Sequence, residues 1–400
     1  MPLEELRQIL FDIVPEPSVE EVPLYESCGR ILAQNVIAED NVPPFDRSPY
    51  DGYAFRAADV ASASPEHPVT LKVLEEIPAG GISHFPVTEG TAVRIMTGAP
   101  LPEGADTITM YEVTKFTDTE VTLFSSYEKG SNIVLAGEDV KKGQLLAHPG
   151  MVIDAALCAT MASQNIPNPK VYKKLKVGVI STGSELVNVG EERTPGMIYD
   201  SNKYHVSGAL KKFLFEPVAY PSVKDTVDGI ADMLKKALDE CDAVVTTGGV
   251  SVGDFDDTPA AIEAAGGTIL FRGAPLKPGM ACAYAVKGGK LICALSGNPA
   301  SSITNFYMLA LPALRKMAGY EVYDPDPITV TLAGDFAKKS KGGRIIHGQL
   351  DLTDGTAKMV LSRDQGNVII NTLIGADVIA VVPKGSGPLP AGTQLKAYLI

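Results

Sequence analysis

The stretch DAVVTTGGVSVGDFDDTPAAIEAAG, residues 242–266, joins a short apolar run to a helix-forming run through a loop rich in glycine, serine and threonine. The run AVVTT indicates a buried strand, and residues 258–266 indicate a helix that begins with proline in its first turn. A strand followed by a helix is typical of a βαβ crossover, so the stretch predicts a mainly parallel sheet. Its loop also raises a chemical question. Small residues suit an anion, whereas the carboxylates of Asp254, Asp256 and Asp257 repel one.

The same alternation continues on both sides of this stretch. Apolar runs such as LKVGVI and KLICAL are short enough for buried strands, and amphipathic runs of helical spacing separate them. Strands are expected at 175–180, 216–223, 267–273, 281–286 and 290–295, and helices at 201–214, 225–241 and 298–319. Asp225 is the expected N-cap of its helix. Together these elements predict an α/β domain with a parallel sheet.

Changes in composition along the chain predict four domains. Residues 41–145 are rich in Val, Thr, Gly and Pro, with short apolar runs, which is typical of a β-rich domain. Helical patterns flank that segment at 3–14, at 26–35 (ESCGRILAQN) and around DAALCATMAS, so the β-rich domain is expected to be an insertion. The predicted domains are a helical linker domain (1–40 plus 146–170), an inserted β-rich domain (41–145), an α/β domain (171–319) and a C-terminal β-barrel-like domain (320–400).

Composition excludes several classes of protein. The chain has 400 residues and a net charge of −13, which argues against a general binder of nucleic acid or anionic membranes. Its five cysteines are scattered without a CxxC pair, which fits a reducing compartment better than a disulfide framework or a zinc site. The N-terminus lacks the pattern of a signal peptide, and no apolar run reaches about 18–20 residues. We therefore expect a cytoplasmic protein.

Three of the expected strands end in loops of small and hydroxyl residues. Such loops expose backbone N–H groups at the carboxyl edge of the sheet, where ligands of α/β folds bind, and they suit a phosphate or a similar oxyanion. None matches the P-loop or the GxGxxG fingerprint, so a Walker-type ATPase or a Rossmann dehydrogenase is not expected. The alternative is that small residues merely permit tight turns. The candidate substrate-binding residues are Ser181, Thr182, Gly183, Gly248, Gly249, Ser251, Gly253, Ser296, Gly297, Asn298 and Pro299.

The aspartates of the opening stretch are compatible with an anion if a divalent cation lies between them. Asp and Glu are ionised at neutral pH, and Mg²⁺ prefers carboxylates, phosphate oxygens and water as ligands. Asp256, with Asp254 or Asp257 nearby, is therefore a candidate metal ligand. The alternative for Asp257 and for Asp225 is that each only caps a helix.

Further candidates lie outside these loops. RSPYDGYAF places Asp51 among aromatic residues, and MTGAP places Thr97 after a predicted strand. Lys277 in APLKPGM is a candidate cation for an oxyanion. Asp-Gly and Thr-Gly are also common in turns, so a purely structural role for Asp51 and Thr97 is the alternative.

Taken together, RSPYDGYA, RIMTGAP, AGEDV, STGSEL, TTGGVSVGDFDDT, LKPG and SGNPAS resemble the molybdopterin molybdenumtransferase (MoeA) family, which includes the E-domain of gephyrin. The resemblance covers nearly the whole chain, in order and with similar spacing. It implies a multidomain α/β plus β fold with a MogA-like, molybdopterin-binding α/β domain. It also implies insertion of molybdate into adenylylated molybdopterin, with Mg²⁺-dependent cleavage of the pyrophosphate and release of AMP.

The resemblance also implies roles for individual residues and partners. Family members are typically homodimers in which the inserted domain of one subunit completes the site of the other. The implied partners are an adenylyltransferase that supplies the substrate and molybdoenzymes that receive the product. The metal ligands implied are Glu185, Asp225 and Asp256. The catalytic residues implied are Asp51, Thr97, Asp139, Glu185, Asp225, Asp256 and Lys277.

The chain departs from the family pattern at several positions where cations are expected. Met280 stands where the family has a second lysine after Lys277, and Val134 stands where an arginine is expected before Asp139. Of two arginines expected near GGRIIHGQL, only Arg344 is clear. These changes keep two alternatives open. One is a non-catalytic or tungstate-specialised paralogue that binds pterin as a scaffold or carrier. The other is a different nucleotide-handling α/β enzyme.

Overall fold

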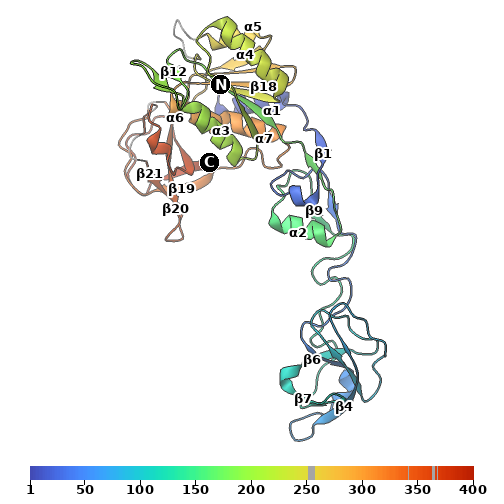
Figure 1. The fold of residues 1–400 in the computed structure, drawn as a ribbon. Coiled ribbons are helices and arrows are strands. Elements are labelled where there is room, and N and C mark those ends of the chain that lie inside the picture. The colour runs from blue at the N-terminus through green and yellow to red at the C-terminus, as the bar shows by residue number, and fades with distance from the viewer. Residues whose placement is uncertain (251–256, 341, 363–364, 367) are drawn as a thin grey trace. The chain divides into compact units, whose positions relative to one another are not determined.

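The structure is a computed structural model that describes residues 1–250, 257–340, 342–362, 365–366 and 368–400 (Figure 1). The chain forms two compact units. Unit 1 comprises Met1–Gln34, Pro149–Asp154 and Asn168–Ile400, and unit 2 comprises Asn35–His148 and Ala155–Pro167. Across the described residues, no helix combines the length and the apolar character that a membrane span requires.

Unit 1 is built on the six-stranded sheet that the sequence predicts. In spatial order its strands are β14 (Glu216–Ala219), β11 (Lys176–Ser181), β15 (Ala243–Thr247), β18 (Lys290–Leu295), β17 (Cys282–Lys287) and β16 (Thr268–Arg272). The first four are parallel, and β17 and β16 add an antiparallel edge. All five residues of β15 are buried, as expected for a strand covered on both faces. The predicted mainly parallel α/β architecture is confirmed.

Helices cover both faces of this sheet (Figure 1). On one face α4 (Val227–Glu240) and α5 (Thr258–Ala264) enclose one apolar core. A second core on the other face contains side chains of α1 (Leu3–Ile13), α3 (Asn202–Lys212), α6 (Pro299–Asn305) and α7 (Leu311–Met317). Ile345 and Ile379 of the C-terminal part join the second core, so that part packs on the α/β layer.

The long helix predicted at 298–319 is interrupted by a π-helical turn, η4 (Phe306–Ala310), between α6 and α7. Pro312 explains part of the irregularity, because it has no N–H to donate to the carbonyl of Met308. That carbonyl instead accepts a 2.8 Å hydrogen bond from Nε of the buried Arg7. Arg7 also pairs at 2.9 Å with Asp324, which follows α7 in the chain, so polar contacts as well as apolar packing hold α1 in place.

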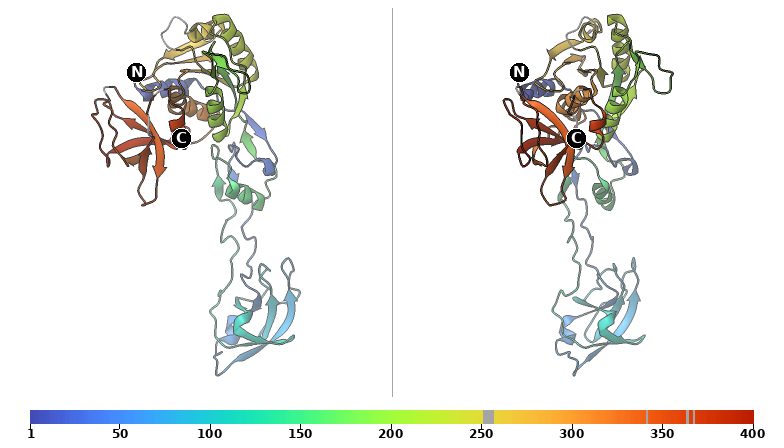
Figure 2. Two further views of the ribbon diagram at one scale, coloured as in Figure 1. Left: turned by 60° about the vertical axis from the view of Figure 1, so that its left-hand side comes forward. Right: turned by 90° about the vertical axis from the view of Figure 1, so that its left-hand side faces the viewer.

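The C-terminal part of unit 1 is a closed barrel (Figure 2). Side chains alternate between the barrel interior and its surface, with Val378, Ala380 and Val382 inside, as the period of a strand requires. Closure leaves no free sheet edge. The strands are β19 (Ile328–Leu332), β20 (Arg344–Asp351), β21 (Lys358–Leu361), β22 (Val378–Val382) and β23 (Gln394–Leu399), with η5 (Asn371–Leu373) before β22. The remaining elements of unit 1 are β1 (Val19–Glu21), η1 (Leu24–Glu26), β10 (Lys170–Tyr172), β12 (Leu186–Val187) and β13 (Ile198–Tyr199).

Unit 2 contains the predicted β-rich domain. Its sheet has the order β6 (Thr107–Met110), β3 (Gly52–Phe55), β5 (Thr91–Ile95), β4 (Val69–Ile77), β8 (Glu120–Leu123) and β7 (Thr114–Phe116). β3 is buried throughout, with Tyr53 and Phe55 in one apolar cluster and Ala54 in the other. The unit also contains β2 (Val36–Ile37), η2 (Ala57–Val60), η3 (Tyr111–Val113), β9 (Leu145–Ala147) and α2 (Ala155–Ser163).

The helix predicted at 26–35 is wrong. Backbone N–H groups of this stretch bond to distant carbonyls, with Leu32 donating to Met151 and Ala33 donating to Lys170. Gly29 adopts a φ of 78°, in the left-handed region that a right-handed helix cannot contain. Non-local pairing therefore replaces the helical hydrogen bonds that the local pattern suggested.

Candidate active site

The three predicted substrate-binding loops lie together at the carboxyl edge of the sheet. β11, β15 and β18 are neighbours, and the loops that follow them are bonded across the strand ends. The N–H of Thr182 donates to the carbonyl of Thr247 at 2.8 Å, and the N–H of Gly248 donates to the carbonyl of Leu295 at 2.9 Å. The third loop, residues 296–299, leads directly into α6. The spatial grouping of these loops is what the strand order required.

Two glycines allow the loops to approach this closely. Gly248 has a φ of 109°, and a Cβ there would lie 2.2 Å from the carbonyl oxygen of Thr182. Gly249 has a φ of 62°, and its Cβ would lie 2.5 Å from Oγ1 of Thr258. Among the described residues, Oγ1 of the buried Thr182 has no hydrogen-bond partner. A buried hydroxyl of this kind needs a partner, so Thr182 is a candidate donor to a ligand held by these loops.

A buried ion pair that sequence reasoning missed supports the same loops. Asp200 is 1% exposed and Lys203 is 8% exposed, and their charged groups lie 3.1 Å apart. Asp200 also accepts from the hydroxyl of Ser181 at the end of β11 and from Ser222, each at 3.0 Å. Thr247, at the end of β15, donates to Ser181 at 3.2 Å. The ends of two strands are thus held by one polar network, which no spacing in the sequence indicates.

Asp225 and Glu185 lie on adjacent loops beside the strand ends. Oδ2 of Asp225 accepts a 2.9 Å hydrogen bond from the N–H of Ser184, the residue before Glu185. Asp225 is not the helix cap that the sequence predicted. Thr226 is the N-cap of α4 and accepts from the N–H of Gly229, because its hydroxyl is one residue closer to the free N–H groups.

The carboxylate of Glu185 folds over its own loop. A Cβ at Gly183 would lie 2.7 Å from Oε2 of Glu185. Within the described residues, no hydrogen bond or ion pair engages this carboxylate, so its oxygens are available to a ligand. A carboxylate without a partner beside a second, singly hydrogen-bonded carboxylate on the adjacent loop suits a hard divalent cation, which completes its shell with water and phosphate oxygens.

The third predicted metal ligand cannot be placed beside these two acids. Asp256, with the predicted loop residues Ser251 and Gly253, lies outside the described residues. Within the part of the chain that the structure describes, no three His, Cys, Asp or Glu side chains form a cluster suited to a metal ion. Asp257 occupies the N-cap position of α5 without a side-chain capping bond.

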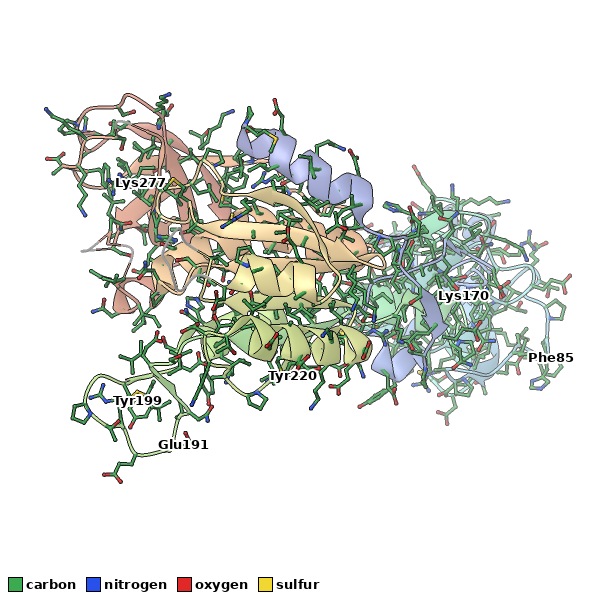
Figure 3. All side chains as sticks on the ribbon, turned by 90° about the horizontal axis from the view of Figure 1, so that it is seen from above. Phe85, Lys170, Glu191, Tyr199, Tyr220 and Lys277 are labelled. Carbon is green, nitrogen blue, oxygen red and sulfur yellow. The ribbon has the colours of Figure 1, made fainter. Side chains whose placement is uncertain are left out.

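A cavity of about 470 Å³ lies between the α/β sheet and the barrel. Three of the described residues that line it are cationic: Lys277 (labelled in Figure 3), Lys338 and Arg344. Nε of Arg344 is buried and has no partner among the described residues. Such a group requires an acceptor, and the surrounding cations and hydroxyls suit an oxyanion. The other lining residues are Leu276, Pro278, Gly279, Met280, Ala281, Ser296, Asn298, Ser301, Gln365 and Gly366.

Sequence reasoning found only part of this cavity. Lys277 and Arg344 were singled out, and Ser296 and Asn298 connect the cavity to the third strand-end loop. Lys338 was missed, although it belongs to the basic run AKKSKGGR in an acidic chain. Ser301 and Gln365 were also missed, and no sequence pattern distinguishes them. The cavity residues come from both the α/β layer and the barrel.

In unit 2, Asp51 and Thr97 are in contact. Oδ1 of Asp51 accepts from both the N–H and the hydroxyl of Thr97, each at 2.7 Å. These two hydrogen bonds lower the pKa of Asp51, and the charge of Arg94 lowers it further. Asp139 lies in another turn, where its N–H donates to the carbonyl of Val42 at 3.0 Å. The structure thus pairs Asp51 with Thr97 and places Asp139 in unit 2 and Glu185 and Asp225 in unit 1.

Comparisons with known proteins agree with both units. Residues 1–164 match the family described as MoeA N-terminal region (domain I and II), and residues 178–316 match the probable molybdopterin binding domain. A molybdopterin molybdenumtransferase of Staphylococcus epidermidis is 35% identical over 396 residues, 99% of this chain and 94% of that protein. One from Staphylococcus aureus is 35% identical over 399 residues, 100% of this chain and 95% of that protein.

Solved structures give the same result. The molybdopterin biosynthesis moeA protein from Pyrococcus horikoshii OT3 is similar with a TM-score of 0.85 and 31% identity, covering 100% of both chains. A molybdenum cofactor biosynthesis protein from Pyrococcus furiosus, at 21% identity and a TM-score of 0.61, shares the fold. The similarity therefore extends over the full length of the chain.

Proposed function

Because the chain belongs to the molybdopterin molybdenumtransferase family, we propose that it inserts molybdate into adenylylated molybdopterin and releases AMP. The chain is a transferase of molybdenum cofactor biosynthesis. One observation carries the proposal. The strand-end loops, which suit a phosphate, share Ser296 and Asn298 with a cavity whose cations suit an oxyanion. A substrate phosphate and a molybdate can therefore be held beside each other in unit 1.

The strand-end loops are proposed to hold the phosphate groups of the pterin nucleotide. Gly248 and Gly249 let the loops pack closely at this edge, and Thr182 contributes a hydroxyl that has no hydrogen-bond partner among the described residues. We assign the same role to the other predicted loop residues, namely Ser181, Gly183, Ser251, Gly253, Ser296, Gly297, Asn298 and Pro299. Cleavage of the pyrophosphate adds water across the P–O–P bridge, which leaves one phosphate on the pterin and the other on AMP.

Glu185 and Asp225, with Asp256, are proposed to hold a divalent cation such as Mg²⁺. The free carboxylate oxygens of Glu185 and the position of Asp225 beside Ser184 support this assignment. When bound, the cation would neutralise charge between these carboxylates and the pyrophosphate. Without it, the carboxylates would repel the phosphate groups that the neighbouring loops attract.

The cavity between the sheet and the barrel is proposed to hold molybdate before insertion. Lys277, Lys338 and Arg344 offset its two negative charges, and the hydroxyls of Ser296 and Ser301 donate to its oxygens. Met280 contributes no charge to this wall. Tungstate has the same charge and geometry, so competition between the two oxyanions is expected.

Asp51 is proposed either to orient the reacting dithiolene and molybdate or to accept a proton from them. Thr97 engages one carboxylate oxygen and thereby leaves Oδ2 for the substrate. Asp139 is proposed as a further acid of this site. We also propose the four-domain division. The chain is proposed to form a homodimer in which unit 2 of one subunit completes the site on unit 1 of the other. Separate partner proteins are proposed to supply the adenylylated pterin and to accept the cofactor.

The test is incubation of the full chain with adenylylated molybdopterin, molybdate and Mg²⁺, with measurement of AMP. AMP that appears only when both ions are present supports the proposal. Pterin binding without AMP release would instead favour a scaffold or carrier role, and activity with tungstate in preference to molybdate would favour the specialised paralogue. The absence of both pterin binding and AMP release would refute all three.

A further inference from the structure

We propose that Asn305 and Tyr284 are positioning residues for the oxyanion cavity, because they set the conformation of the turn from Lys277 to Met280. The inference rests on the proposed function in one respect, namely that this cavity takes molybdate. Neither residue lines the cavity, so neither is expected to touch the oxyanion itself.

Asn305 is fully buried at the end of α6 and bonds to the turn directly. Its Nδ2 donates a 2.9 Å hydrogen bond to the carbonyl of Gly279. Its Oδ1 accepts a 2.5 Å hydrogen bond from the hydroxyl of Tyr284, which is also 0% exposed. The tyrosine hydroxyl therefore fixes which end of the amide faces Gly279, and a flipped amide would leave buried groups unpaired.

The turn is held at its ends and in its middle. The N–H of Ala274 donates to the carbonyl of Met280 at 3.0 Å, and the N–H of Ile345 donates to the carbonyl of Lys277 at 2.9 Å. Gly279 lies between these points with a φ of 105°, a conformation that glycine adopts readily. The hydrogen bond from Asn305 holds the middle of the turn to the core.

This anchoring matters because the functional side chains of the turn are not buried. Lys277 and Met280 are exposed, whereas Gly279 is buried beneath them. A long flexible cation is directed mainly by its backbone when no other side chain holds it. The amide of Asn305 therefore determines where the ammonium group of Lys277 can reach, and a small shift of the turn would separate it from Arg344 across the cavity.

The experiment compares Tyr284→Phe and Asn305→Asp with the matched control Tyr220→Phe. Tyr220 (labelled in Figure 3) is a buried tyrosine on the other face of the same sheet, and its hydroxyl bonds to Glu240 at 2.7 Å. AMP release is measured against molybdate concentration, and equilibrium binding of molybdate is measured in parallel. The melting temperature of each variant reports on folding.

Tyr284→Phe is expected to raise the KM for molybdate about three- to tenfold, since one buried hydrogen bond contributes about that much. Its kcat at saturating molybdate should stay within about twofold of the wild type. A change that weakens ground-state and transition-state binding equally raises the KM without lowering kcat. Asn305→Asp removes the donor to Gly279 and is expected to have the larger effect. Tyr220→Phe leaves both constants unchanged.

The inference is overturned if Tyr284→Phe lowers the melting temperature while the KM and the binding constant for molybdate stay at wild-type values. Tyr284→Phe decides the question even if Asn305→Asp does not fold. A wild-type protein that binds molybdate without releasing AMP would refute the proposed function, and the binding comparison would still decide the positioning role. Absence of molybdate binding by the wild type would overturn both.

Discussion

The main-chain N–H of Ile345 donates a 2.9 Å hydrogen bond to the carbonyl of Lys277. This bond joins the start of the barrel strand β20 to a loop of the α/β sheet. Arg344 precedes Ile345, so this bond brings the arginine beside the lysine at one cavity. Neither the sheet nor the barrel supplies all the cations of that cavity. Its affinity for an anion therefore depends on the contact between the two.

Lys277→Met is expected to weaken the binding of molybdate most directly. A charge-assisted hydrogen bond contributes about 1.5–3 kcal/mol, so the KM for molybdate should rise by about 10- to 100-fold. Lys174→Met, at an exposed lysine that does not line the cavity, is the matched control. Equal KM values for the two variants would show that Lys277 does not contact the oxyanion.

Met280→Lys is expected to change molybdate affinity in the opposite direction. Met280 is 70% exposed and lines the cavity, so a lysine there fits without disturbing the core. An additional cation should lower the KM for molybdate, and the gain should shrink as salt is raised, because exposed charges are screened. The measurement is the KM at low and at high ionic strength. A KM that rises, or that is insensitive to salt, contradicts an electrostatic role for this wall.

Asp51→Asn is expected to abolish AMP release with little change in melting temperature, because the carboxylate is exposed.

Thr97→Ala should lose less activity, since the main-chain N–H of residue 97 still donates to Asp51. Losing the hydroxyl donor destabilises the charged carboxylate, so the pKa of Asp51 rises and the acid limb of the pH–rate profile moves to higher pH. Asp118→Asn, at another exposed aspartate of unit 2, is the control. If the acid limb of Thr97→Ala does not shift, the ionisation that controls the rate is not that of Asp51.

Asp225→Asn is expected to raise the Mg²⁺ concentration that gives half-maximal AMP release. A neutral amide is a weaker ligand for a hard cation than a carboxylate, so excess Mg²⁺ should restore part of the rate. Asp228→Asn, in the first turn of α4, is the matched control because it changes the same charge on a neighbouring exposed residue. If Asp225→Asn lowers kcat with no change in Mg²⁺ dependence, the residue acts on the substrate and not through the cation.

The elements of unit 1 could be predicted because each carries its own local pattern. Strand β15 and helix α5 are visible in the opening stretch alone, and the strand order then brings Thr182, Gly248 and Gly297 together. Local pattern failed where non-local pairing decides the conformation, as at residues 26–35. It also failed at Asp225, because Thr226 offers an equally good cap one position later.

The cavity was only partly predictable for a related reason. Lys277 and Arg344 could be named as cations, but their meeting depends on how the barrel packs against the sheet. That packing is produced by apolar side chains such as Ile345 and Ile379, which resemble any other core residues in the sequence. The same holds for Asn305, whose role depends on a turn distant in the chain.

The junction between the sheet and the barrel is also expected to be sensitive to acid through His347. This histidine of β20 is 4% exposed, and its Nε2 lies 3.1 Å from the hydroxyl of Thr304 on α6. Burial lowers the pKa of His347 to about 4 from 6.5, with a further contribution from His205 on α3. The folded protein therefore binds fewer protons than the unfolded chain, so stability is complete above pH 6.5 and is lost as pH falls toward about 4.

Between pH 7 and pH 5 this histidine should account for a loss of about 2 kcal/mol in the free energy of unfolding. His347→Gln keeps a polar side chain near Thr304 and removes the titration, so its unfolding free energy should fall less over the same interval. Denaturant unfolding at both pH values measures the difference, and the exposed His67→Gln is the control that should retain the wild-type dependence. Parallel losses in the wild type and in His347→Gln would mean that the proton is taken up elsewhere. Acid weakening of the junction would then have to be traced to the carboxylates of unit 1.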